Sequence, residues 1–210
     1  MLALTFSTGI IDAVGYLGLD RVFTGNMTGN VVIMGMAMAG GDGLPVLGPT
    51  LALVGFMLGA AAAGRALRGG HPGWSSRTTR LLLVVGAMMA GVSVTLFAVG
   101  DDLTQAGGVA VTTVLGAAMG LQAAAARVVA VKDVTTVVVT STITGLAADS
   151  VFGGGIPGGG VRRVAAVVLI LVGAGVGALA ITWHLGVGPM ICAVLTVAVA
   201  VAGRGLARTP

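Results

Sequence analysis

Two short polar runs of matching composition interrupt apolar stretches of this chain, about half the sequence apart. The first is Thr-Gly-Asn-Met-Thr-Gly at residues 24–29, and the second is Thr-Ser-Thr-Ile-Thr-Gly at residues 140–145. Polar side chains need hydrogen-bond partners and glycine loosens the backbone, so neither run suits the middle of a lipid-facing helix. In a membrane protein, a matching run in each half is typical of an internal duplication with two broken helices and a transport site between the repeats.

The composition is that of an integral membrane protein. Hydrophobic residues make up 56% of the chain and charged residues only 9%, whereas about a quarter of a soluble domain is charged. The arginines occur in pairs and clusters between apolar stretches, which argues against nucleic acid as a partner. The apolar N-terminus lacks a basic region and a small-residue cleavage site and contains Asp12, so we expect a membrane span there rather than a signal peptide.

Six apolar stretches are long enough to cross a bilayer, which takes about 20 residues. They are residues 2–19, 47–67, 81–99, 106–129, 164–183 and 187–202. Two further stretches, 23–39 and 134–148, contain the polar runs. A helix from Met27 to Ala39 would be only about 20 Å long at about 1.5 Å per residue, short of the hydrocarbon thickness of about 30 Å. We therefore expect re-entrant or broken half-helices in these two stretches.

Charge placement favours six spans over eight. With a cytoplasmic N-terminus and two re-entrant stretches, nearly all basic residues face the cytoplasm: Arg65, Arg68, Arg77, Arg80, Arg127, Lys132, Arg162, Arg163, Arg204 and Arg208. The outward loops then hold Asp20, Arg21, Asp42, Asp101 and Asp102. With eight spans, the best orientation leaves two arginine pairs outside, against the positive-inside rule. We predict a multi-pass protein of the bacterial inner (plasma) membrane with both termini in the cytoplasm.

This topology gives the two halves opposite orientations in the membrane. The predicted fold is a single all-α integral membrane domain, residues 1–210, with six transmembrane helices and two re-entrant half-helices in inverted repeats at about 1–100 and 105–205. Gly9 and Gly120 fall in comparable places on the spans that precede the polar runs. Glycines with GxxxG spacing allow close helix contact, with packing inside the bundle favoured over a homodimer face. The pairs are Gly25/Gly29, Gly116/Gly120 and Gly173/Gly177.

Asp12 is the acidic residue deepest in a predicted span. A carboxylate is costly in the membrane, so such residues usually face a cavity or a partner. One interpretation is a proton-coupling or cation-coordinating group; the other is a structural carboxylate that caps the free N–H groups of a broken helix. Both remain open at this point. The corresponding region of the second half offers Gln122, which does not titrate.

The two polar runs would place hydroxyl groups and free backbone amides at the N-termini of two half-helices, where anions and carboxylates are favoured. The predicted substrate-binding residues are Asp12, Thr24, Asn26, Thr28, Asn30, Gln122, Thr140, Thr142 and Thr144. The alternative is that these side chains only satisfy the broken backbone and join the two halves. The pairing of the runs across the halves favours a site.

These features predict a transporter for a small polar or anionic solute in which proton coupling would involve Asp12, with a passive channel as the alternative. Nothing indicates an enzyme, because there is no Gly-x-Ser-x-Gly motif, no His/Glu metal cluster and no pair of catalytic carboxylates. A single cysteine, Cys192, excludes a disulfide framework and a cysteine-based metal site. We expect no cofactor and no metal. The expected partners are the lipid bilayer and a small-molecule solute.

The sequence also resembles the YoaK family of bacterial and fungal membrane proteins. The resemblance is carried by Gly-Ile-Ile-Asp-Ala-Val-Gly-Tyr-Leu at residues 9–17 and Phe-Thr-Gly-Asn-Met-Thr-Gly-Asn at residues 23–30. It continues in the second half with Gly-Leu-Gln at 120–122, Arg127, Asp-Val-Thr-Thr at 133–136 and the second polar run. It implies a polytopic membrane protein and supplies no established substrate. Similar proteins usually begin with a basic segment, so the resemblance implies a short or trimmed N-terminus here.

Overall fold

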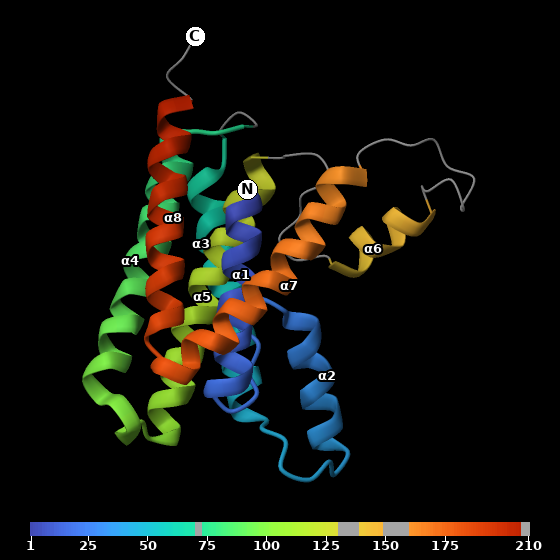
Figure 1. The fold of residues 1–210 in the computed structure, drawn as a ribbon, viewed down its shortest axis with the longest axis vertical. Coiled ribbons are helices and arrows are strands. Elements are labelled where there is room, and N and C mark those ends of the chain that lie inside the picture. Colours follow the sequence, from blue (N-terminus) through green and yellow to red (C-terminus); the bar gives the residue numbers. More distant parts are fainter. Residues whose placement is uncertain (70–72, 130–138, 149–159, 207–210) are drawn as a thin grey trace.

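The computed structural model describes residues 1–69, 73–129, 139–148 and 160–206, which form helices and their connections without a strand. Figure 1 shows long helices gathered into a bundle, with α2 and α6 set to one side. The all-α expectation is confirmed for these residues. In chain order the elements are α1 (Leu2–Gly18), α2 (Met27–Met38), α3 (Leu47–Leu67), α4 (Ser76–Val99), the 3-10 turn η1 (Gly100–Asp102), α5 (Gln105–Val129), α6 (Val139–Ala148), α7 (Gly160–Trp183) and α8 (Val187–Leu206).

Among the described residues, five helices are long and apolar enough to cross a membrane: α3, α4, α5, α7 and α8. The sixth expected span, at residues 2–19, forms α1, which has 17 residues and lies at the short end of what can cross a bilayer. It ends where the chain turns sharply, because Asp20 and Arg21 both have positive φ, 59° and 57°. This turn lets the amide of Val22 donate to the carbonyl of Gly15.

The two stretches with polar runs form short helices, as expected. α2 has 12 residues and α6 has 10, which corresponds to about 18 Å and 15 Å at about 1.5 Å per residue. Neither is long enough to cross the hydrocarbon core alone. The residues before α6, 130–138, lie outside the described part of the chain, and so does the expected start of this stretch at 134.

Glycines allow two pairs of long helices to meet backbone to backbone. On α5, a side chain at Gly120 would overlap the carbonyl of Phe56 on α3, and one at Gly116 would meet Ala52. On α7, Gly173 lies against Phe6 and Gly177 lies against Ile10, both on α1. In each pair of helices the residue numbers of the contacting residues increase together. Therefore α3 runs parallel to α5, and α1 runs parallel to α7. The GxxxG glycines of α5 and α7 therefore serve packing within the bundle.

The contacts between helices have a regular order. When α1 to α4 are exchanged in order with α5 to α8, the contact between α1 and α7 corresponds to the contact between α5 and α3. The contact between α4 and α8 corresponds to itself. In the same way α2 lies on α3 while α6 lies on α7, and α4 contacts α5 while α8 contacts α1. Each contact thus has a counterpart when the first four α-helices are exchanged with the last four. The same exchange matches Gly9, which lies against Ile170 and Ala174, with Gly120, which lies against Phe56 and Ala60.

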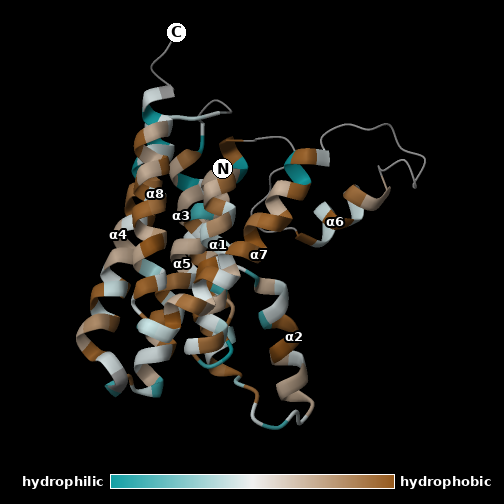
Figure 2. Ribbon diagram, in the orientation of Figure 1, coloured by the Kyte–Doolittle hydropathy of each residue, from teal (hydrophilic) through white to brown (hydrophobic). Residues whose placement is uncertain are grey.

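Within the described ranges, the basic residues other than Arg21 gather at one end of the bundle. This end holds the start of α1, the end of α3 and the start of α4, joined by a cluster that includes Leu4, Leu67 and Leu82. The parallel pairings bring the end of α5 and the start of α7 to the same side. Figure 2 shows hydrophobic residues along the helices and many of the hydrophilic ones near helix ends. The basic residues of this end are Arg65, Arg68, Arg77, Arg80, Arg127, Arg162, Arg163 and Arg204; Lys132 and Arg208 lie outside the described residues.

Candidate functional site

A cleft of about 700 Å³ lies where α1, α2, α6 and α7 approach one another. It is within the size range of small-molecule sites. Its wall combines the start of α2 with the start of α6, so the two half-helices expected from the sequence border one space. Figure 1 shows both short helices beside the α1–α7 pair. The lining residues are Thr8, Asp12, Tyr16, Phe23, Gly25, Asn26, Thr28, Gly29, Val32, Ile33, Val139, Thr140 and Ile170.

Asp12 holds the chain that leads into α2. Its neighbours on α1, Ile10, Ile11 and Val14, are fully buried in the core, which fixes the helix beneath the half-buried carboxylate. The Oδ1 atom accepts hydrogen bonds from three successive amides, those of Thr24 at 3.0 Å, Gly25 at 2.6 Å and Asn26 at 3.3 Å. This is the geometry of the capping interpretation. The Oδ2 atom makes no hydrogen bond within the described residues and is left to the cleft.

The start of α2 is further fixed by its own asparagines. Asn26 is the N-cap, and its Oδ1 accepts from the amide of Gly29 at 3.3 Å. Asn30 is fully buried and forms a two-way pair with the backbone of Phe23: its Oδ1 accepts from the Phe23 amide at 2.9 Å, and its Nδ2 donates to the Phe23 carbonyl at 2.6 Å. The polar run therefore folds into a loop whose backbone groups are satisfied from within.

We expect Asn30→Asp to lower the free energy of unfolding by about 2 kcal/mol. The carboxylate keeps an acceptor for the Phe23 amide but loses the donor, and it places a negative oxygen against the Phe23 carbonyl. Denaturant titration of the purified protein in mixed micelles measures the change. Asn30→Ala is the matched comparison, because it removes both hydrogen bonds without adding charge. An Asn30→Asp protein as stable as the unmodified chain would show that the donor does not matter.

The second polar run sits differently from the first. Residues 24–26 of the first run precede α2, whereas residues 140–145 lie inside α6, which begins at Val139. Thr140 is exposed and lines the cleft. Thr144 turns back on its own helix, where its hydroxyl donates to the carbonyl of Thr140 at 2.9 Å, and Thr142 is buried. Only the first turn of α6 thus faces the proposed site.

The structure brings together part of the predicted set of site residues. Asp12, Asn26, Thr28 and Thr140 line the cleft. Thr24, Asn30, Gln122, Thr142 and Thr144 are not among the lining residues. Gln122 lies on α5 and is fully buried against α1. Its side-chain amide nitrogen, Nε2, donates to the carbonyl of Leu4 at 3.5 Å. The Gln122 side chain does not line the cleft because it lies on the side of α5 that packs against α1.

The sequence interpretation missed two polar lining residues on α1, Thr8 and Tyr16. Together with Asp12 they recur every four residues, which places them on one face of a helix. That spacing is a signal the sequence offered. The ring of Tyr16 stacks on Phe23, with 4.8 Å between the ring centroids and 25° between the planes. This aromatic pair links α1 to the loop before α2 and forms one wall of the cleft.

Among the lining residues within the described part of the chain, Asp12 alone is charged and none is basic. The other polar groups are hydroxyls and one amide side chain. The three amides before and at the N-cap of α2 are already bound by Asp12. Among the described residues there is no group of three or more His, Cys, Asp or Glu side chains that could hold a metal ion. The cleft can therefore offer a bound molecule hydrogen bonds from hydroxyl and amide groups and one contact with a carboxylate, that of Asp12.

Comparison with known proteins gives a family and one curated relative. A family model described as "Protein of unknown function (DUF1275)" matches residues 1–202. The chain is 30% identical over 148 residues to UPF0700 transmembrane protein YoaK of Bacillus subtilis (strain 168), covering 70% of this chain and 64% of the relative. The match thus spans slightly less than two thirds of the relative's length. No solved structure matches. The resemblance noted in the sequence is confirmed, and the chain, a multi-pass membrane protein, belongs to the DUF1275 family of unknown function.

Proposed function

We propose that this protein is a membrane transporter, not an enzyme, for a small polar solute that binds in the cleft between α1, α2, α6 and α7. The observation that carries the proposal is that the first turns of α2 and α6 line the same cleft as Asp12. Broken or short helices whose ends border a polar cavity are the usual way in which transporters build a site within the bilayer. A protein with a purely structural role would not need this opening between its two shortest helices.

The proposal includes two inverted repeats, at about residues 1–100 and 105–205. It is supported by the exchange of helix contacts, in which α1 to α4 correspond to α5 to α8. Glycines support it as well, because the contact of Gly59 on α3 with Ala117 on α5 corresponds to the contact of Gly173 on α7 with Phe6 on α1. In this arrangement α1 is the sixth span and α2 and α6 are re-entrant. The cleft then lies at the repeat interface.

The proposed orientation puts the basic end of the bundle in the cytoplasm of a bacterial cell, with both termini on that side. It rests on the arginines at the ends of α3, α5 and α8 and at the starts of α4 and α7. Basic residues are retained on the cytoplasmic side of membrane proteins. The opposite end carries the exposed residues Asp20, Arg21, Asp42 and Asp102.

The cleft favours a neutral or cationic solute over an anionic one. Free amides at a helix N-terminus favour an anion, but Asp12 already places a carboxylate at the start of α2, where it binds the amides of Thr24, Gly25 and Asn26. Within the described lining, Asp12 has no basic neighbour, so its carboxylate repels an anion and attracts a cation. The hydroxyls of Thr28 and Thr140 supply donors and acceptors for a polar solute from opposite short helices.

Flux into liposomes tests this proposal. The reconstituted protein is given radiolabelled glycerol, urea, methylammonium or acetate, with protein-free liposomes as the baseline. We expect saturable uptake of a neutral or cationic probe, and at least a severalfold loss of that uptake in Thr28→Val and in Thr140→Val, because each removes a hydroxyl at nearly constant volume. Thr95→Val is the matched control, since Thr95 is exposed on α4 and its hydroxyl bonds to its own helix.

The same assay separates the alternatives. Flux that rises linearly with solute concentration would indicate a passive channel. Uptake of acetate alone would contradict the solute class inferred from the cleft. Equal losses of uptake in Thr28→Val, Thr140→Val and Thr95→Val would contradict a role of the cleft in transport.

A further inference from the structure

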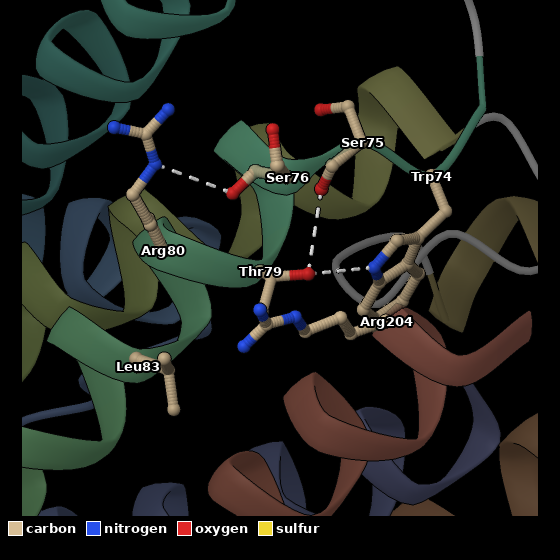
Figure 3. Close-up of a pocket in the computed structure, with 7 residues that line it drawn as sticks. All are labelled: Trp74, Ser75, Ser76, Thr79, Arg80, Leu83 and Arg204. Carbon is tan, nitrogen blue, oxygen red and sulfur yellow. Dashed lines mark hydrogen bonds between the residues drawn. The ribbon is translucent and has the colours of Figure 1, made fainter. Parts of the chain in front are cut away.

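A second pocket, of about 430 Å³, lies at the basic end of the bundle between the start of α4 and the end of α8. It is lined by Trp74, Ser75, Ser76, Thr79, Arg80, Leu83 and Arg204. Figure 3 shows Arg204 extending from α8 toward Thr79 on α4, with Arg80 on the other side of Ser76. The pocket is far from the polar runs in the sequence and shares no lining residue with the cleft.

The floor of this pocket is built by specific contacts. The indole Nε1 of Trp74 donates to the hydroxyl of Thr79 at 2.9 Å, and that hydroxyl donates to the carbonyl of Ser75 at 3.4 Å. The indole ring lies directly on Gly203 of α8, where a side chain would overlap it. Ser75 caps α4 by accepting from the amide of Thr78 at 3.2 Å. These contacts hold α4 and α8 in a fixed position relative to each other.

The pocket carries two positive charges that have no carboxylate partner within the described residues. Arg80 donates from Nε to the carbonyl of Ser76 at 3.4 Å, which leaves the ends of its guanidinium unused. Arg204 makes no hydrogen bond or ion pair within the described residues. The N-terminal end of the α4 dipole adds a partial positive charge. Arginine, serine hydroxyls and a helix N-terminus are groups that bind a phosphate ester, which guanidinium groups can contact through two parallel hydrogen bonds.

The surroundings of the pocket indicate where such a phosphate comes from. Leu83 lines its lower wall and is 39% exposed, and Val201, one turn before Arg204, is 60% exposed. An apolar surface therefore continues from the pocket along the outer face of α4 and α8. Trp74 lines the pocket beside its two arginines. Tryptophan is common at the boundary between lipid headgroups and hydrocarbon. A ligand with a charged headgroup and an acyl chain would match both parts of this surface.

We propose that the pocket formed by Trp74, Ser76, Arg80 and Arg204 binds the phosphodiester headgroup of an anionic phospholipid from the leaflet at the basic end. The headgroup lies between the two guanidinium groups and the start of α4, and an acyl chain follows Leu83. Basic pockets between transmembrane helices are known to select anionic headgroups. The bound lipid would join α4 to α8 and so stabilise the contact that relates the two halves. This site is independent of solute transport.

Lipid binding to the purified, delipidated full chain tests the proposal. Native mass spectrometry and thermal unfolding are followed during titration with phosphatidylglycerol, phosphatidylcholine or inorganic phosphate. We expect phosphatidylglycerol to bind and raise the unfolding temperature more than phosphatidylcholine does. Arg80→Gln with Arg204→Gln should weaken this binding by about 25-fold, because each arginine near an anionic membrane surface contributes about fivefold. The matched control is Arg65→Gln with Arg68→Gln, which removes two charges from the same end outside the pocket.

Three results would overturn the proposal. Equal weakening in the two double variants would show that diffuse charge, and not the pocket, attracts the lipid. Equal protection by inorganic phosphate would assign the pocket to a free anion. Equal binding of phosphatidylglycerol and phosphatidylcholine by the unmodified chain would exclude a selective headgroup site, and this comparison needs no variant that could fail to fold.

Discussion

Asp12→Ala is expected to lower the free energy of unfolding by about 3 kcal/mol, because it leaves the amides of Thr24, Gly25 and Asn26 without their common acceptor. The first two of these groups are partly buried, so water replaces the carboxylate poorly. The start of α2 then loses its attachment to α1. Asp12→Asn should cost only about 1 kcal/mol, since its carbonyl oxygen still accepts, although a neutral acceptor is weaker. Denaturant titration in mixed micelles measures both values.

Asp42→Ala provides the control for loss of a carboxylate, because Asp42 is exposed in the connection between α2 and α3. Flux measurements then separate the two roles proposed for Asp12. If Asp12 only caps the loop, Asp12→Asn retains flux with and without a pH gradient. If it couples proton movement, Asp12→Asn loses pH-driven uptake while solute exchange continues. An Asp12→Ala protein as stable as the Asp42→Ala control would contradict the capping role.

Gly120→Ala should destabilise the protein by about 3 kcal/mol, at the upper end of overpacking effects. A methyl group at this position would overlap the carbonyl of Phe56, and its next neighbour is the amide nitrogen of Ala60 at 2.9 Å. Backbone atoms cannot move aside as the end of a flexible side chain can, so α3 and α5 would have to separate. Thermal unfolding of the purified protein, with helix content followed by circular dichroism, measures the effect.

Gly108→Ala is the matched control on the same helix. A Cβ at Gly108 meets nothing within 4 Å, so the substitution should stabilise α5 by about 0.5–1 kcal/mol through helix propensity alone. Gly9→Ala tests the proposed repeats, because a methyl group there would overlap the carbonyl of Ile170 in the same manner. Comparable losses in Gly9→Ala and Gly120→Ala are expected. A harmless Gly120→Ala would contradict the close approach of α3 and α5.

Helix boundaries were predicted well where hydropathy defines them. The expected span at 47–67 coincides with α3, and the span at 106–129 differs from α5 by one residue at its start. The expected span at 81–99 is wrong at its beginning, because α4 starts at Ser76. Its first turn is polar and is set by the cap that Ser75 provides, and a hydropathy pattern does not detect a polar first turn.

The candidate site was predicted less completely than the helices. The sequence indicated that Asp12 and the two polar runs would share a site, and Asp12, Asn26, Thr28 and Thr140 do line one cleft. It also suggested that the runs were equivalent, yet the first forms a loop before α2 and the second lies within α6. Which side chains face the cleft depends on the rotation of each helix about its axis, and that rotation is set by packing.

The sequence by itself determined that this is a helical membrane protein, where its long helices lie, and which short stretches are too polar and too short to cross the bilayer. These properties follow from local composition, because each backbone segment must satisfy its own hydrogen bonds in lipid. Only the tertiary structure decided the partner of each helix and the three backbone amides to which the Asp12 carboxylate is bound. Those depend on contacts such as Gly120 with Phe56 and Asp12 with Gly25, which join residues from separate helices and loops and leave no periodic pattern in one sequence.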